Sequence, residues 1–190
     1  MNAKQANFPI ASSAHFAALV TAVGALDLGP IMWKVVADPE GPQWDRAFAE
    51  KTEADYRRFL ILCAAYPDRM IVPSKNVDQF WHAHILDTIK YAEDCQASIG
   101  FFLHHFPYFG ARGAEDRAAL ETEFESTQAL WTHHFGAMDA GDATTCFKVP
   151  SSDAAALCIK TQKVAERPAL CGPGNCDPQM VGERPRLKAA

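Results

Sequence analysis

Residues 78–84, Asp-Gln-Phe-Trp-His-Ala-His, carry the most chemical information in this sequence. Two histidines flank one alanine, Trp81 precedes them, and Asp78 lies four residues before His82. Neutral imidazole is the commonest protein ligand for metal ions, and carboxylates complete many such sites. This short window therefore predicts a metal site or a catalytic site.

A second histidine pair, His104-His105, follows farther along the chain, so four of the seven histidines fall in one window. Two histidines and one carboxylate with open coordination positions suit non-haem iron and oxygen chemistry. We therefore predict one transition-metal ion, with iron or copper favoured over zinc. Its ligands are expected to come from a set of five residues: Asp78, His82, His84, His104 and His105.

Helical geometry limits how these ligands combine. Each residue of a helix turns by about 100°, so His82 and His84 point to roughly opposite sides and cannot easily share one ion. Asp78 and His82 form an i,i+4 pair. His84 instead lies on a predicted buried stripe made of Val77, Trp81, His84, Thr88, Tyr91 and Cys95. Two alternative ligand combinations therefore remain possible: Asp78 with His82, or His84 alone. Each would be completed by His104 or His105, which are adjacent and expected to diverge.

Several neighbouring side chains are candidates for supporting roles. Asp87 lies one turn beyond His84 and is expected to orient an imidazole. Tyr91, Tyr108 and Trp81 are expected to line the pocket, the two tyrosines as candidate catalytic groups together with Asp87. A non-catalytic interpretation remains beside this one. His84 would then be a core histidine bonded to Tyr91 or to the backbone, and Asp78–His82 a surface pair worth a few tenths of a kcal/mol.

Apolar residues recur at helical spacing through most of the first two thirds of the chain. They predict helices over residues 12–28, 43–65, 75–97 and 114–135, with Ser12 or Ser13, and Ser74, as caps and a break near 51–52 in the second. Gly29-Pro30, Gly100 and Gly136 are expected to end helices. The state of residues 31–36 is ambiguous, and the aromatic stretch 101–113 is expected to form a loop over the core. No strand pattern is long enough for a sheet, so the predicted class is all-α, a compact bundle of about five helices.

The character of the chain changes after Gly136. Residues 1–136 are expected to form the helical domain, and residues 137–190 an irregular tail with a short helix at about 153–165. The tail holds most of the six cysteines, including a Cys-x4-Cys turn, and we expect them to be thiols. They are Cys146, Cys158, Cys171 and Cys176. The basic residues near its end, Arg184, Arg186 and Lys188, are expected to be solvated. His133-His134 closes the last predicted helix, where the helix dipole favours a cationic imidazole.

Composition narrows the classes of function. The net charge of −5 and the lack of a basic stripe argue against nucleic-acid binding. No apolar run approaches the roughly 20 residues of a membrane span. The N-terminal apolar stretch, residues 14–28, fits an amphipathic helix better than a signal peptide. We therefore expect a cytoplasmic protein with neither a membrane nor a nucleic-acid partner.

The string from Val77 to Thr88, followed by Tyr91 and Asp94-Cys95, resembles the glycine-rich domain-containing protein-like family of bacterial and plant proteins. The likeness runs from about residue 59, through Leu-His-His-Phe-Pro-Tyr-Phe-Gly at 103–110, into the helix ending at Gly136. It implies a shared helical domain rather than a particular activity. The matching positions that look like a site are Asp78, Trp81, His82, His84, Asp87, Tyr91, His104 and His105. Plant members have been linked to RNA, but this chain has no RNA-binding pattern.

Two functions from different classes follow. The first is a metal-dependent oxidoreductase acting on a small molecule or peptide; a zinc hydrolase is less expected because no general base stands out. The second is a non-catalytic binding module. In it, a structural metal or a satisfied polar histidine core would support the aromatic loop 101–109 against a peptide or protein partner. The signatures of serine hydrolases, phosphate-binding loops, dinucleotide sites and zincin peptidases are missing.

Overall fold

The computed structural model describes residues 12–139 and 184–188 of the chain. This described part is all-α, as predicted, and contains six helices and no strand. In chain order they are α1 (Ser13–Gly24), α2 (Gly29–Val36), α3 (Arg46–Ala65), α4 (Lys75–Ile85), α5 (Thr88–Ser98) and α6 (Ala114–Phe135).

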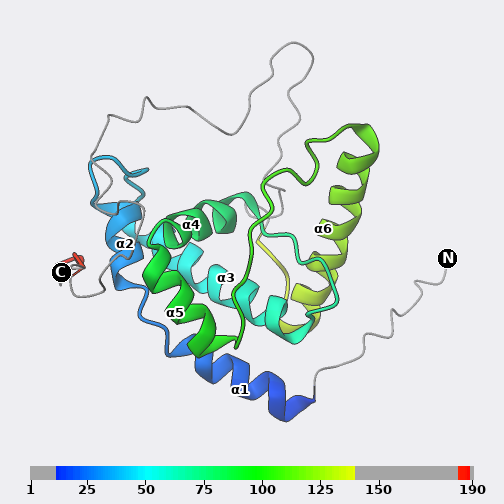
Figure 1. Ribbon diagram of the computed structural model, residues 1–190, viewed down its shortest axis with the longest axis horizontal. Coiled ribbons are helices and arrows are strands. Elements are labelled where there is room, and N and C mark those ends of the chain that lie inside the picture. Colours follow the sequence, from blue (N-terminus) through cyan, green and yellow to red (C-terminus); the bar gives the residue numbers. More distant parts are fainter. Residues whose placement is uncertain (1–11, 140–183, 189–190) are drawn as a thin grey trace, which may run out of the picture.

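Helix α3 forms the centre of the bundle. It contacts α1, α2, α4 and α6, while α5 packs against α4 and α1 (Figure 1). Aromatic side chains fill the α3–α4 interface: Tyr56 meets Phe80 at 5.2 Å between ring centroids, and Phe59 meets Trp81 at 5.0 Å. All four rings are buried, so α4 is fixed against the core along the face that carries Trp81.

Local signals for helix starts and ends are largely confirmed. Ser12 caps α1 by accepting a hydrogen bond from the His15 N–H, and Ser74 caps α4 through the Val77 N–H. Gly100 and Gly136 follow α5 and α6 with φ of 82° and 87°, a left-handed conformation that glycine adopts without strain.

The predicted single helix over residues 75–97 is wrong. The chain leaves the helix at Leu86 and Asp87, and a new helix begins at Thr88. Asp87 has non-helical dihedral angles (φ −89°, ψ 74°), and its side chain accepts a hydrogen bond from the Lys90 N–H. An aspartate that caps a new helix competes with continuation of the old one, which explains the break. Thr88 is consequently exposed rather than part of a continuous buried stripe.

Further expectations about the helix bounds are corrected. The first helix ends at Gly24, four residues earlier than expected. Residues 31–36, whose state the sequence left open, belong to α2. Pro30 lies in the first turn of α2, where a missing N–H costs nothing. The second predicted helix starts later, at Arg46, and runs without a break past residues 51–52.

The loop over residues 101–113 is irregular, as expected, and is attached at both ends. Near its start the Tyr91 hydroxyl of α5 donates a hydrogen bond to the Leu103 carbonyl over 2.5 Å. Near its end the Gly110 N–H donates to Asp116 of α6 over 2.7 Å, and a Cβ at Gly110 would lie 2.5 Å from Leu120. The loop therefore crosses from α5 to α6 along a defined path (Figure 1).

Much of the predicted tail lies outside the described residues. This applies to the short helix at 153–165, to Cys146 and Cys158, and to the Cys171–Cys176 turn. The two cysteines in the described part, Cys63 and Cys95, are buried free thiols whose pKa is raised by burial.

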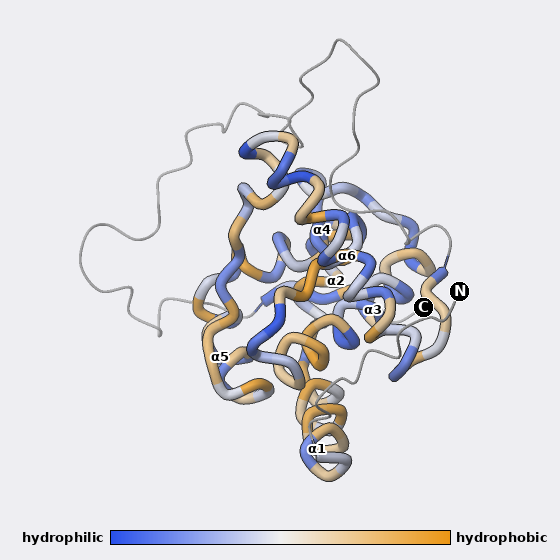
Figure 2. Tube along the Cα trace, turned by 90° about the vertical axis from the view of Figure 1, so that its right-hand side faces the viewer, coloured by the Kyte–Doolittle hydropathy of each residue, from blue (hydrophilic) through white to orange (hydrophobic). Residues whose placement is uncertain are grey.

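Among the described residues, no single helix has both the length and the apolar content of a membrane span. The pair α1 and α2 meets both criteria only when the two helices are taken together, across a 59° bend. Figure 2 shows that most residues of α1 are hydrophobic. Its Leu19 and Val23 are buried in the core.

Candidate metal centre

Asp78, His82 and His105 come together at one point on the surface, and we call them the surface cluster. His82 Nε2 and His105 Nε2 are 3.0 Å apart, and His105 Nε2 lies 3.0 Å from Asp78 Oδ1. His82 Nε2 is 3.7 Å from Asp78 Oδ2. Two ligands come from successive turns of α4 and the third from the aromatic loop.

The spacing of these atoms fits a metal ion. An ion about 2.1 Å from each of three ligand atoms holds them about 3.0–3.4 Å apart. The two histidine nitrogens and the nearer Asp78 oxygen of each histidine are 3.0–3.7 Å apart, and one ligand atom of each residue lies within 4.8 Å of the other two, so an ion could enter with small side-chain shifts. Asp78 and His105 are largely buried, while the His82 side chain is 51% exposed, so the cluster is open to solvent on one side. The same three groups can also form a hydrogen-bonded triad that shares a proton.

A buried chain of contacts holds the loop histidine in place. The Trp81 ring packs on the His105 ring with centroids 4.6 Å apart. The Trp81 indole N–H donates to the Tyr91 hydroxyl over 2.8 Å, and that hydroxyl donates in turn to the Leu103 carbonyl. Trp81 and Tyr91 are therefore positioning residues for His105 rather than groups that face an open pocket. Burial raises the pKa of Tyr91, which keeps its hydroxyl protonated.

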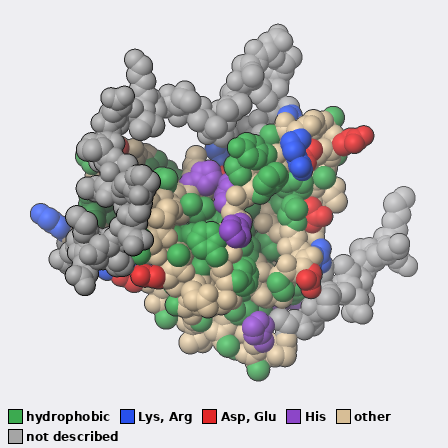
Figure 3. Space-filling model, in the orientation of Figure 1, with side chains coloured by type: hydrophobic (Ala, Val, Ile, Leu, Met, Phe, Trp, Pro, Cys, Tyr) green, Lys and Arg blue, Asp and Glu red, His purple; other side chains and the backbone are tan. Residues whose placement is uncertain are grey.

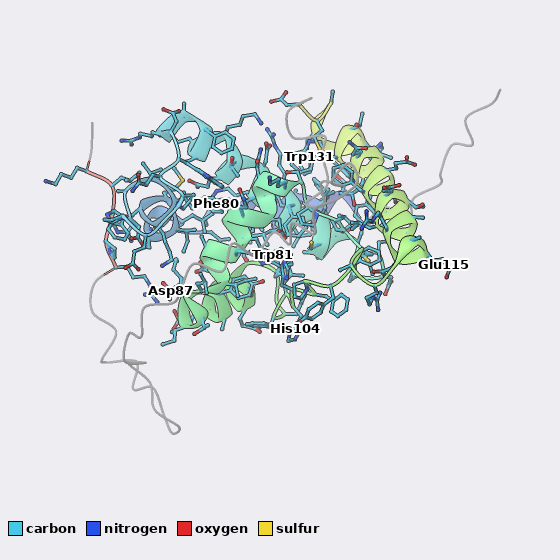
Figure 4. All side chains as sticks on the ribbon, turned by 90° about the horizontal axis from the view of Figure 1, so that it is seen from above. Phe80, Trp81, Asp87, His104, Glu115 and Trp131 are labelled. Atoms are coloured by element: carbon cyan, nitrogen blue, oxygen red, sulfur yellow. The ribbon has the colours of Figure 1, made fainter. Side chains whose placement is uncertain are left out.

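His104 and Tyr108 lie apart from this cluster. His104 is exposed and packs against Phe102 at 4.8 Å, so the two adjacent loop histidines diverge. Figure 4 shows Trp81 near the centre of the molecule and His104 at its edge. Tyr108 is 61% exposed and packs against Phe106. Histidines on this face lie among hydrophobic side chains (Figure 3).

His84 belongs to a separate group in the core. It is 1% exposed, and both of its ring nitrogens are engaged: Nδ1 with the Tyr56 hydroxyl at 2.9 Å, and Nε2 with Asp94 Oδ2 at 3.0 Å. Lys90 Nζ lies 3.0 Å from the same Asp94 oxygen. We call Tyr56, His84, Lys90 and Asp94 the buried network. Because no ring nitrogen is spare, His84 is not among the residues that this structure offers to an ion.

Two members of the buried network, Asp94 and Tyr56, have shifted pKa values. Burial alone would raise the pKa of Asp94, but hydrogen bonds from His84 and Lys90 outweigh it and the pKa is lowered. Burial raises the pKa of Tyr56 well above its ordinary value. A charged Asp94 and a neutral Tyr56 hydroxyl therefore hold the His84 ring between them. Tyr56 and Asp94, as partners of His84, were not anticipated in the sequence, which favoured Tyr91 or the backbone.

The structure also corrects the roles expected for Asp87 and His134. Asp87 contacts no imidazole: it caps α5 and pairs with Arg184, whose hydrogen bonds outweigh desolvation and lower the Asp87 pKa. His134 accepts or donates a hydrogen bond with the Tyr66 hydroxyl at 2.7 Å and stacks on Phe16. Burial, reinforced by His133, lowers the pKa of His134, so the expected cationic state at the end of α6 is not supported.

Comparison with known proteins shows which family this chain belongs to. The profile of the UCP032817-like family matches residues 30–126, which include α2 from its second residue, α3 to α5, the loop, and every member of the surface cluster. The chain belongs to this family. The resemblance to glycine-rich domain-containing proteins is confirmed by two such proteins of Arabidopsis thaliana, numbered 1 and 2. Each is 33% identical to this chain over 93 residues.

The family match concerns a domain rather than whole proteins. The aligned region covers 47% of this chain but only 11% and 12% of the two plant relatives. No solved structure matches the chain. The family match therefore covers residues 30–126, and an activity has to be argued from the residues themselves.

Proposed function

We propose that this domain binds one transition-metal ion through Asp78, His82 and His105 and uses it for oxidoreductase-type chemistry on a small molecule or peptide. The single observation behind the proposal is the convergence of two imidazole nitrogens and the Asp78 carboxylate, whose two oxygens lie 3.0 Å from His105 and 3.7 Å from His82. Two histidines with one carboxylate are the ligand set of non-haem iron oxygenases, so iron is the first choice, followed by copper and zinc.

An open coordination sphere is the feature that separates catalysis from a structural role. Structural zinc sites are closed by four protein ligands, whereas this cluster supplies three from the described residues. The exposed side of His82 leaves room for oxygen or substrate to reach the ion. Trp81 and Tyr91 hold His105, which reduces the reorganisation needed when the ion binds.

The test is metal content and affinity in protein purified without a histidine tag. We expect one equivalent of metal by elemental analysis, and at least a tenfold loss of Co²⁺ affinity in each of Asp78→Asn, His82→Ala and His105→Ala. His104→Ala is the matched control, because it removes the neighbouring exposed imidazole and should leave affinity unchanged. Wild-type protein that takes up no stoichiometric metal would refute the proposal.

A second measurement addresses the open position. Protein loaded with Fe²⁺ without oxygen should bind nitric oxide, which occupies a free position on iron and gives a characteristic electron paramagnetic resonance signal. The signal should be absent from His105→Ala. Bound iron that gives no nitric oxide adduct would indicate a closed, structural site.

A binding module is the second candidate function, and one observation favours it. Four large hydrophobic side chains on the loop are exposed: Phe101, Phe102, Phe106 and Tyr108. Exposed apolar patches of this kind often contact partners. Under this alternative, Phe106→Ser with Tyr108→Ser would abolish a peptide interaction while metal content and metal reactivity stay unchanged.

A further inference from the structure

Residues 184–188 lie against helices that are distant from them in the sequence (Figure 1, red, beside α2). Arg184 forms a two-pronged contact with Asp87: Nε lies 2.5 Å from Oδ2, and Nη2 lies 3.0 Å from Oδ1. These residues are 97 positions apart. The expectation that this basic end is simply solvated is therefore wrong for Arg184.

Arg186 repeats the same contact with Asp27 across 159 positions. Its Nη1 lies 2.8 Å from Oδ1, and its Nη2 contacts Oδ2. Paired N–H···O bonds of this kind match the planar guanidinium to a carboxylate, and a lysine cannot reproduce them. Two such pairs in one short segment define both its position and its direction on the surface.

Each receiving carboxylate is fixed by the start of a helix. The Gly29 N–H, at the first residue of α2, donates to Asp27 Oδ1 over 3.1 Å, and the Lys90 N–H donates to Asp87. A Cβ at Gly29 would lie 2.5 Å from Arg186 Nη1. Gly29 is not among the glycines with positive φ, so the space it leaves, rather than its conformation, is what admits the guanidinium.

The rest of the segment complements these contacts. Pro185 separates the two arginines, and the backbone there is neither helix nor strand. In an extended chain, the side chains of residues two positions apart point to the same side. This spacing explains how Arg184 and Arg186 both reach the same surface of the domain. Leu187 packs against the hydrophobic core as a partly buried residue. The docked pattern is thus Arg-x-Arg-Leu.

We propose that the surface formed by Asp27, Gly29 and Asp87 is a docking site for peptide segments of the form Arg-x-Arg-Leu, and that residues 184–188 occupy it within this chain. The charge balance supports this: Glu93 and Asp94 add to the negative potential at Arg184, and the chain as a whole carries −5. Arg186 lowers the pKa of Asp27 to about 2, so this carboxylate is charged at any physiological pH.

The site shares no residue with the proposed metal centre. Asp27, Gly29 and the docked segment lie outside residues 30–126, the part shared with the family, whereas Asp87 lies inside it. Isolated exposed ion pairs contribute little, so recognition requires both arginine contacts and the leucine together. A segment on the same chain also competes with free peptide at a high effective concentration.

The experiment uses the full chain with Arg184→Ala and Arg186→Ala, which vacates the site. A fluorescent synthetic peptide with the sequence Gly-Glu-Arg-Pro-Arg-Leu-Lys is titrated and followed by anisotropy. We expect saturable one-to-one binding to this variant and at least tenfold weaker binding to the wild type. Adding Asp27→Asn and Asp87→Asn to the variant should abolish binding. Gly29→Ala, which crowds the guanidinium without changing any charge, should weaken it.

A peptide with lysine in place of both arginines is the matched control, since it keeps the charge and loses the two-pronged geometry. Equal binding of the lysine and arginine peptides, or no binding to the vacated variant, would overturn the proposal. Equal binding to wild type and variant would show that residues 184–188 do not occupy the site. A wild-type dimer that dissociates in the double-arginine variant would assign the segment to a second copy, against occupancy within one chain.

Discussion

His82 and His84 are two residues apart on α4, yet they belong to different environments. His82 is half exposed and shares its Nε2 contacts with His105 and Asp78, whereas His84 is fully buried between Tyr56 and Asp94. Each imidazole has one aspartate and one further partner. The surface cluster takes its third member from a loop, whereas the partners of His84 in the buried network come from α3 and α5.

This difference shows how one short motif can serve two purposes. In the buried network both ring nitrogens are committed, so His84 contributes to stability by fixing α3, α4 and α5 together. In the surface cluster three polar side chains converge beside solvent, an arrangement that contributes little to stability and remains available to a ligand. The free energy of unfolding should therefore respond strongly to changes in the buried network and weakly to changes in the surface cluster.

The largest expected effect is that of His84→Ala. Removing a fully buried ring leaves a cavity, and the Tyr56 hydroxyl and the Asp94 carboxylate lose their partner. We expect the free energy of unfolding to fall by about 3–5 kcal/mol, measured by urea denaturation. A loss below about 1 kcal/mol would contradict the structural role assigned to His84.

Asp94→Asn should cost about 1.5–3 kcal/mol near neutral pH, because charged hydrogen bonds to His84 and Lys90 are lost. The pKa of Asp94 is lower in the folded chain than its ordinary value of 3.8. The unfolded chain therefore binds the proton more readily, and this stabilisation is present above about pH 4 and is lost as pH falls through the folded pKa. Urea denaturation across this range should show a shallower acid dependence in Asp94→Asn; identical slopes would contradict it.

Tyr56→Phe and Tyr91→Phe form a matched pair, since both remove the hydroxyl of a fully buried tyrosine. Each should lower the free energy of unfolding by about 1–3 kcal/mol. Only Tyr91→Phe releases Trp81 and Leu103, and hence His105. Its Co²⁺ affinity, measured by calorimetry, should fall about 10–100-fold, as for other residues that orient a ligand. Equal affinities in the two variants would break the link between Tyr91 and the surface cluster.

His82→Ala is expected to have the smallest effect on stability, within about 0.5 kcal/mol, because the side chain is half exposed. Thermal unfolding of the metal-free protein gives the measurement. The same substitution should remove metal uptake. A destabilisation as large as that of His84→Ala would erase the distinction between the two histidines.

Much of this architecture could be predicted from residue types at particular positions. The bounds of α6 and the roles of Ser74, Gly100 and Gly136 follow from local preferences that the tertiary fold does not override. The divergence of His82 and His84 follows from helical geometry alone. Because these features depend on a few neighbouring residues, one sequence is enough to specify them.

Other features depend on tertiary structure and could not be predicted. An aspartate within an amphipathic pattern is compatible with a continuous helix, so Asp87 did not reveal that a new helix begins there. The direction of α5 after this break brings Asp94 to His84. Likewise, the choice of His105 over His104 depends on the path of the loop, which the contacts of Tyr91 and Trp81 determine.

The packing of Trp81 on His105 has an optical consequence. Trp81 is one of four tryptophans and is almost fully buried, with its ring centroid 4.6 Å from the imidazole centroid. A copper or ferric ion bound by that imidazole would quench the emission of the adjacent indole. Trp131 on α6 is equally buried but contacts Phe135 rather than the surface cluster, so its emission would be quenched less. The domain would thus report the occupancy of its own cluster without an added dye.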